Sequence, residues 1–220
     1  MTSFEVKYSG GKIVPSSDLR VGTTEVEGNV KSWRRIAIWN VRTMLQCGKL
    51  ENLNIEMARM KVDILGLSEM RWPRAGDLWS GEYRLIHTGT AENNPGIGGV
   101  GIIMSKAIGK KIKGFIQYNE RIILVKIETK PKDTIIVQVY MHISNSSERE
   151  LEEVYEGIEK VKGDENLIIM GDWNAVVGKE SLGHMIRSYG LGNRNERGDR
   201  FYLFFSKSIS LIQYNNQITK

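Results

Sequence analysis

Four polar residues follow the ends of three apolar, strand-like stretches, and together they could hold a divalent metal ion. They are Asn40, Glu69, Asp172 and Asn174. Ligands of α/β sheets gather outside the carboxyl ends of the strands. A glutamate and an aspartate that meet there suit Mg²⁺, which typically takes one or two carboxylates and keeps several waters. Any one such residue is more often a cap or a turn former, but three strand ends on one expected edge favour a functional site.

The first two of these residues require a strand-helix-strand unit to position them. An apolar stretch ends at Trp39-Asn40, and residues 63–68 form a buried run that leads into Glu69. Between them, helical spacing predicts one apolar helix face, made of Leu50, Leu53, Met57 and Met60. Such a unit favours a parallel strand pair joined by a right-handed crossover.

The rest of the chain predicts a second layer of strands. Short apolar runs joined by turns predict successive, antiparallel strands at residues 83–88, 100–105, 121–128 and 134–140. A helix is expected over residues 147–161, where Ser147 and Glu150 form a capping box, followed by a buried strand at 167–170. A weak helix near 199–205 and a strand at 209–212 follow. This order favours two layers of strands covered by helices.

Length and composition indicate one folded domain and only a mild preference for an anionic partner. The chain has 220 residues, and one core can serve up to roughly 250. Residues 1–33 lack periodicity and are expected to be a flexible leader, so that the domain occupies residues 34–220. The net charge of +5 leans only mildly towards nucleic acid, because the basic residues are spread along the chain.

The location expected from the sequence is intracellular. The first residues lack the apolar stretch of a signal peptide, and no apolar run approaches the roughly 18 residues that span a membrane. The single cysteine, Cys47, excludes an internal disulfide and a cysteine-cage zinc site. Cys47 is also a weak candidate nucleophile, because no base lies near it in sequence.

One glycine-rich segment imitates a dinucleotide-binding motif. Gly96, Gly98 and Gly101 have the spacing G-x-G-x-x-G, which needs a strand before it and a helix that opens within it. Here Pro95 precedes the segment and the β-like sequence VGIIM follows it. A tight turn that enters a strand accounts better for these glycines.

Several local sequences resemble the endonuclease/exonuclease/phosphatase superfamily. They occur in the expected order as AIWNVR (37–42), LSEMRW (67–72), VQVY (137–140) and MGDWNA (170–175). The segment GLGNRNERG (190–198) narrows the resemblance to the endonuclease domain of RTE-type long interspersed retrotransposons and to craniofacial development protein 2-like sequences. The resemblance implies an α/β fold, a two-sheet α/β sandwich that here lacks its C-terminal strand or strands.

The resemblance also implies a metal-assisted attack of water on a phosphodiester of DNA. Glu69, helped by Asn40 and Asp172, would hold Mg²⁺, with Mn²⁺ as the alternative. Asp172 would orient or deprotonate the attacking water, and Asn174 would fix Asp172 and contact phosphate. Tyr140 would donate a hydrogen bond towards the developing oxyanion. Trp39 and Trp173 are expected to pack beneath these residues.

Two departures from the family pattern affect the expected activity. Met141-His142 follow Tyr140 where the family usually has Ala-Pro, so the loop is expected to lie differently. The family's final Ser-Asp-His is absent, since no Asp-His dipeptide occurs in the sequence. We therefore expect an impaired, Mg²⁺-dependent DNA endonuclease domain in the nucleus, without membrane association. The alternatives are a non-enzymatic relic that binds nucleic acid or protein, and a phosphoesterase acting on a lipid or small phosphodiester.

Overall fold

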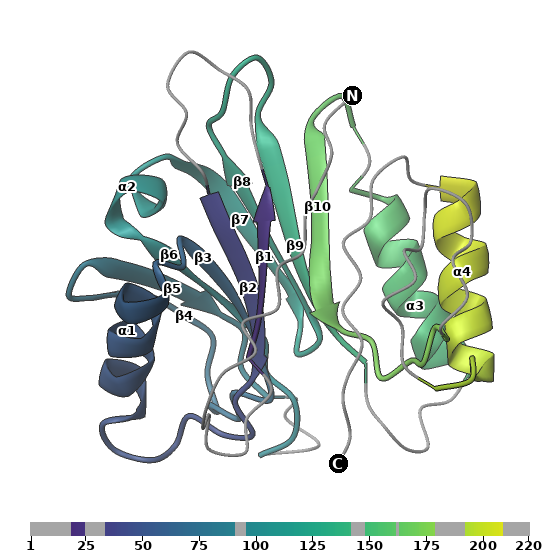
Figure 1. The fold of residues 1–220 in the computed structure, drawn as a ribbon, viewed down its shortest axis with the longest axis horizontal. Coiled ribbons are helices and arrows are strands. Elements are labelled where there is room, and N and C mark those ends of the chain that lie inside the picture. Colours follow the sequence, from purple (N-terminus) through teal and green to yellow (C-terminus); the bar gives the residue numbers. More distant parts are fainter. Residues whose placement is uncertain are drawn as a thin grey trace.

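Two β-sheets packed face to face, with helices on their outer faces, form the chain (Figure 1). This is a computed structural model, and it describes residues 19–24, 34–90, 96–141, 148–161, 163–178 and 192–208. The first sheet has six strands in the order β1-β2-β3-β6-β5-β4, and the second has four in the order β10-β9-β8-β7. The two-sheet α/β sandwich expected from the sequence is confirmed.

The first sheet contains the predicted strand-helix-strand unit. Its strands are β1 (Leu19–Thr24), β2 (Arg34–Asn40), β3 (Ile64–Ser68), β4 (Gly76–Ser80), β5 (Tyr83–His87) and β6 (Gly101–Ser105). Helix α1 (Lys49–Met60) connects β2 to β3, which pair in parallel as predicted, whereas every other pair in this sheet is antiparallel. The short helix α2 (Lys106–Gly109) follows β6.

The second sheet ends in another parallel pair. Its strands are β7 (Ile112–Asn119), β8 (Ile122–Ile127), β9 (Thr134–Tyr140) and β10 (Asn166–Asp172). Helix α3 (Glu148–Glu159) connects β9 to β10, which run in parallel, whereas β7, β8 and β9 form an antiparallel meander. Helix α4 (Glu196–Ser208) packs beside α3 on the outer face of this sheet (Figure 1).

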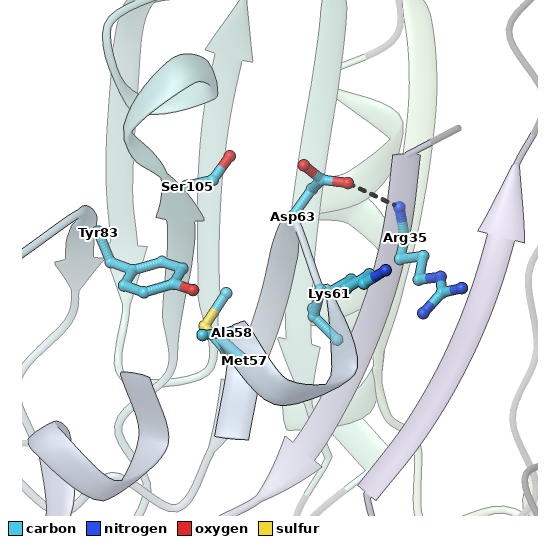
Figure 2. A pocket seen from close by; sticks show the side chains of 8 residues that line it. Arg35, Met57, Ala58, Lys61, Asp63, Tyr83 and Ser105 are labelled. Carbon is cyan, nitrogen blue, oxygen red and sulfur yellow. Dashed lines mark hydrogen bonds between the residues drawn. The ribbon is translucent and has the colours of Figure 1, made fainter. Parts of the chain in front are cut away.

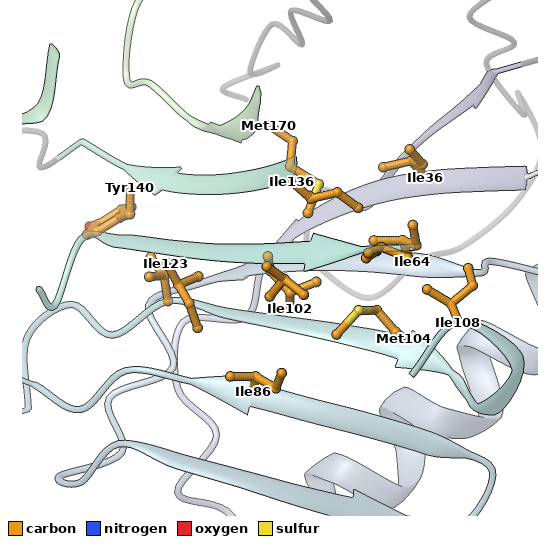
Figure 3. Packing of buried hydrophobic residues seen from close by; sticks show 13 residues of the cluster. Ile36, Ile64, Ile86, Ile102, Met104, Ile108, Ile123, Ile136, Tyr140 and Met170 are labelled. Atoms are coloured by element: carbon orange, nitrogen blue, oxygen red, sulfur yellow. The ribbon is translucent and has the colours of Figure 1, made fainter. Parts of the chain in front are cut away.

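Apolar side chains fill three layers of the molecule. The layer between the sheets is rich in isoleucine and reaches from Ile108 at one end to Tyr140 at the other (Figure 3). Leu53 and Met57 of α1 cover the outer face of the first sheet, as the helical spacing predicted. Val154 and Ile158 of α3 cover the outer face of the second sheet together with phenylalanines of α4. Two sheets buried on both faces explain why most strands were readable as apolar runs.

Some elements differ from those expected. Residues 19–24, assigned to the flexible leader, form β1, which pairs with the otherwise free edge of β2 and satisfies its backbone groups. Strands β4 and β7 and helix α2 were not predicted. Helix α4 begins before and extends past the predicted 199–205, and the predicted strand at 209–212 lies outside the described residues. In the described part of the chain, no helix is long and apolar enough to cross a membrane.

Candidate active site at the junction of the two sheets

The two parallel strand pairs end at the same edge of the sandwich, and their ends carry the predicted site residues. In the first sheet Asn40 is paired with Ser68, so Glu69 follows directly beside it. In the second sheet Asp172 is paired with Tyr140. Parallel pairing therefore presents two polar residues from each sheet at one edge.

A single side-chain amide joins the two sheets at this edge. The Nδ2 of Asn40 donates to Oε1 of Glu69 at 2.8 Å and to Oδ2 of Asp172 at 3.1 Å. The backbone N–H of Arg42 donates to Oδ1 of Asn40 at 3.1 Å, which fixes the orientation of the amide. The predicted approach of Glu69 and Asp172 is confirmed, with Asn40 lying between them.

The carboxylate of Glu69 accepts hydrogen bonds from three side chains, of which the Asn40 amide is one. Its Oε1 also accepts from the Tyr140 hydroxyl at 3.1 Å, and its Oε2 accepts from the Arg71 guanidinium at 2.8 Å. Burial raises the pKa of Glu69, but the hydrogen bonds from Asn40, Arg71 and Tyr140 and the charge of Arg71 outweigh it and lower the pKa below its ordinary value. Glu69 is therefore a carboxylate at neutral pH, as a metal ligand must be.

Tyr140 is held in its protonated form. Burial raises its pKa, and the negative charge of Glu69, its hydrogen bond to Glu69 and the charge of Asp172 raise it further. Only the charge of Arg71 acts in the opposite direction. The phenol therefore remains a hydrogen-bond donor across the physiological range, which is the role that the resemblance implied for it.

Asn174 lies where it can orient Asp172. Its backbone N–H donates to Oδ1 of Asp172 at 3.2 Å, and its side-chain amide donates to the carbonyl of Met141. The N–H of Met141 donates to the carbonyl of Asp172 at 2.8 Å, so Met141 continues the pairing of β9 with β10 in place of the family's alanine. His142, the other residue of this departure, lies outside the described residues.

Trp173 anchors the turn that carries Asp172 and Asn174. Its side chain is buried, and its ring lies 5.1 Å from that of Phe201 and 5.3 Å from that of Phe205, both edge-on. Such edge-to-face contacts are typical of buried aromatic pairs. The expectation that Trp173 packs beneath the site is confirmed, and helix α4 supplies its partners.

The glycine-rich segment forms a turn that supports the loop of Glu69 and leads into a strand, where a dinucleotide-binding motif would open a helix. The N–H groups of Met70 and Arg71 donate to the carbonyls of Gly99 and Gly98, both at 3.0 Å. Gly98 and Gly99 have positive φ angles, and strand β6 follows them. The predicted turn that enters a strand is confirmed, and this turn holds Arg71 beside Glu69.

The side chains present fit a hydrated Mg²⁺ ion. The site supplies two carboxylates, and the part of the chain described by the structure has no cluster of three or more acidic, histidine or cysteine side chains that would form a fuller cage. Mg²⁺ usually binds through one or two carboxylates, with water and substrate phosphate as its other ligands. Glu69 and Asp172 would be the ligands, with Asn40 beside them.

Other candidate features lie away from this edge. His87 is buried against the ring of Trp72, and desolvation lowers its pKa. Cys47 is exposed. A pocket of about 390 Å³ lies at the opposite end of the first sheet, where Arg35, Asp63 and Tyr83 line it (Figure 2). None of the predicted site residues lines this pocket, so its location gives no support to the candidate active site.

Two residues around the site were not predicted to act there. Arg71 was read only as part of a motif, although a cation two residues from a partly buried carboxylate is a recognisable signal. Gln138 is fully buried between the sheets, where its amide nitrogen reaches the hydroxyl of Ser68 at 3.1 Å. Its signal in the sequence is a polar residue inside an otherwise apolar strand.

Comparisons with known proteins agree with this geometry. The Endonuclease/Exonuclease/phosphatase family model matches residues 37–209. Craniofacial development protein 2 of Bos taurus is 34% identical over 173 residues, which make up 77% of this chain and 29% of the relative. The chain thus spans about three-tenths of the length of this curated relative and of the one from Tragulus javanicus, which is 33% identical.

Solved structures share the fold at low sequence identity. The endonuclease domain of TRAS1, a telomere-specific non-LTR retrotransposon, has a TM-score of 0.54 at 21% identity, covering 79% of this chain and 70% of that one. An AP endonuclease from Leishmania major has the same TM-score at 12% identity, covering 79% and 66%. The family match over residues 37–209, together with the converging strand ends, shows that this chain belongs to the endonuclease/exonuclease/phosphatase family.

Proposed function

We propose that this chain is a Mg²⁺-dependent DNA endonuclease domain of retrotransposon origin, with low turnover when the 220 residues act alone. One observation carries the metal-dependent chemistry. The Asn40 amide holds Glu69 of one sheet and Asp172 of the other within hydrogen-bond distance of the same nitrogen, at 2.8 and 3.1 Å. Two carboxylates this close attract a cation, because each raises the negative potential at the other.

Each group at the site would have a separate role in phosphodiester hydrolysis. A bound Mg²⁺ ion would stabilise negative charge on the transferring phosphate. Asp172 accepts a proton from, or orients, the attacking water, and the backbone N–H of Asn174 keeps its carboxylate in place. Tyr140, which stays protonated, donates a hydrogen bond to a phosphate oxygen as charge develops there.

DNA is the proposed substrate on three grounds. The segment at 190–198 resembles retrotransposon endonucleases, and the net charge of +5 favours a polyanion. The guanidinium of Arg71 pairs with Glu69, so a cationic group borders the edge where a phosphate backbone would lie. We also propose a nuclear location, because most cellular DNA lies there.

Low turnover is proposed because the 220 residues contain no Asp-His dipeptide. In the family, that pair contacts the scissile phosphate, and positioned acid-base groups contribute about 10²–10⁴ in rate. The alternative is a relic that binds nucleic acid or protein without cleaving DNA. It would lack the same dipeptide, and it would differ from the proposed enzyme in having no turnover at all.

Nicking of supercoiled plasmid tests the proposal. The chain is incubated with Mg²⁺, with Mn²⁺ and with EDTA, alongside Glu69→Gln and Asp172→Asn preparations made in the same way. Slow nicking that needs the metal and both carboxylates is expected. Binding of plasmid without any nicking would favour the relic, and release of phosphate from phosphoinositide vesicles without nicking would favour a lipid phosphoesterase.

A further inference from the structure

Gln138 is a polar side chain enclosed between the two sheets. It belongs to β9, lies two residues before Tyr140 and is fully buried. Its Nε2 donates to Oγ of Ser68 at 3.1 Å, with longer contacts to the carbonyls of Leu67 and Val139 at 3.4 Å. The side chain thus crosses from the second sheet to the strand end that carries Glu69.

A glycine on the opposing strand makes room for this crossing. A Cβ atom built on Gly66 would lie 2.0 Å from Oε1 and 2.7 Å from Cδ of Gln138. The other buried side chains of this layer are mostly isoleucine, valine and methionine. Gly66 and Gln138 are therefore complementary: because Gly66 has no side chain, the amide group of Gln138 fits against its backbone.

Folding stability alone does not explain a glutamine here. Its Oε1 is buried and has no hydrogen-bond partner among the residues that the structure describes. A buried acceptor without a partner destabilises the folded state, whereas an apolar side chain of similar shape would not. An unsatisfied polar group in a native core is a reason to look for a role in function.

We propose that Gln138 is a positioning residue that sets the separation between the two halves of the active site. Ser68 is the last residue of β3 and directly precedes Glu69. Gln138 lies two residues before Tyr140, at the end of β9. The hydrogen bond between Gln138 and Ser68 therefore joins the two strand ends that carry Glu69 and Tyr140. It fixes how far Glu69 of the first sheet lies from Tyr140 and Asp172 of the second. The Asn40 amide can reach both carboxylates only at that separation. The catalytic consequence rests on the proposed function, whereas the geometric one does not.

The test compares four variants in the full 220-residue chain. Gln138→Met keeps the length and volume but removes the donor. Ile136→Val, on the same face of the same strand, is the matched packing control. Gly66→Ala displaces the Gln138 side chain without altering it, and Gly66→Ala with Gln138→Ala removes the clash without restoring the donor.

Three readouts separate positioning from packing. The side-chain amide signals of Asn40, in a chain labelled with ¹⁵N-asparagine and assigned by their loss in Asn40→Ala, report the bridge between the sheets. Mn²⁺ binding, followed by electron paramagnetic resonance, reports the metal site. Thermal unfolding reports the fold.

Gln138→Met is expected to move the Asn40 signals towards those of a free amide and to weaken Mn²⁺ binding about 10- to 100-fold, as loss of an orienting partner does. Its unfolding temperature should stay within about 5 °C of the parent. Ile136→Val should leave the Asn40 signals and Mn²⁺ binding unchanged. The double variant should recover the unfolding temperature lost in Gly66→Ala while its Asn40 signals stay displaced.

Unchanged Asn40 signals in Gln138→Met would overturn the inference, and so would loss of folding in that variant, since Gln138 would then serve the fold alone. Recovery of both temperature and signals in the double variant would overturn it as well. Failure of the unaltered chain to bind Mn²⁺ would count against the proposed function only. The Asn40 signals would still decide whether Gln138 positions the site.

Discussion

The Tyr140 hydroxyl donates a hydrogen bond to Oε1 of Glu69 at 3.1 Å, although the two residues are 71 positions apart in sequence and belong to different sheets. The contact closes the candidate site from the side of β9. It also keeps the phenol oriented without involving the substrate. The same hydroxyl is therefore in place to turn towards a phosphate oxygen.

Tyr140→Phe is expected to lower the nicking rate by about 10²-fold, because one positioned donor to a developing oxyanion is worth about 10²–10³. Plasmid nicking under single-turnover conditions measures the change. Tyr118→Phe is the control, since Tyr118 is largely exposed on β7. Equal rates for Tyr140→Phe and the parent would show that the phenol has no part in the reaction.

The rate of the 220-residue chain itself is a second prediction. With Mg²⁺ it should nick supercoiled DNA at least ~10²-fold more slowly than a family member that has the Ser-Asp-His motif. The residual rate should disappear in Glu69→Gln and in Asp172→Asn. Nicking that survives both changes would come from a contaminating nuclease, and a rate equal to the complete relative's would mean that another residue replaces the missing pair.

Acid should selectively remove the contribution of Glu69 to stability. The folded state lowers the pKa of Glu69 from its ordinary value of 4.5, so its stabilising contribution is fully present above that value and is lost as pH falls through the lower, folded pKa. The free energy of unfolding of the parent, minus that of Glu69→Gln, should therefore decrease as the pH is lowered from 6 to 3. Urea unfolding at several pH values measures this difference, and a difference that grows in acid would contradict it.

Gly171 should tolerate no side chain. A Cβ there would lie 2.1 Å from the carbonyl oxygen of Val139, where β10 pairs with β9 immediately before Asp172. Gly171→Ala is expected to lower the free energy of unfolding by about 1–3 kcal/mol or more, because the backbone of β9 cannot move aside cheaply.

Gly114→Ala provides the comparison for Gly171→Ala. Gly114 also lies in a strand, but no atom would come within 4 Å of an added Cβ. Its effect should stay within about 0.5 kcal/mol, as for other surface changes. Urea unfolding measures both variants, and similar effects at the two positions would show that the close approach of β10 and β9 is relaxed in solution.

The sequence predicted those parts of the fold in which burial is strongest. Strand β3 is buried along its whole length and was readable as an apolar run, and helix α1 was readable from its periodic face. Strands β4 and β7 are edge strands with exposed and partly exposed residues, so their sequences lack such a run. Hydrophobic pattern alone cannot separate such strands from loops.

The sequence predicted that Glu69 and Asp172 meet at one edge, but not which side chain joins them. Strand ends and local motifs indicated Asn40, Glu69 and Asp172. The Asn40 amide contacts both carboxylates because of the way in which the two sheets pack. This packing cannot be predicted from the local sequence around any one of the three residues. The partnership of Gly66 with Gln138 was hidden for the same reason, since it joins positions on different strands of different sheets.

The loops of this site contain non-glycine residues in a backbone conformation that L-amino acids rarely adopt. Arg42, Glu69, Arg71 and Asn174 have φ angles between 46° and 60°. Each such residue costs roughly 1–2 kcal/mol, which the surrounding hydrogen bonds must offset. Selection of variants for thermal resistance alone would therefore favour glycine or relaxed backbones at these four positions first. Heat-tolerant descendants of this chain would keep the sandwich and lose the arrangement at its edge, so stability is a misleading guide to which members of such a lineage retain the candidate site.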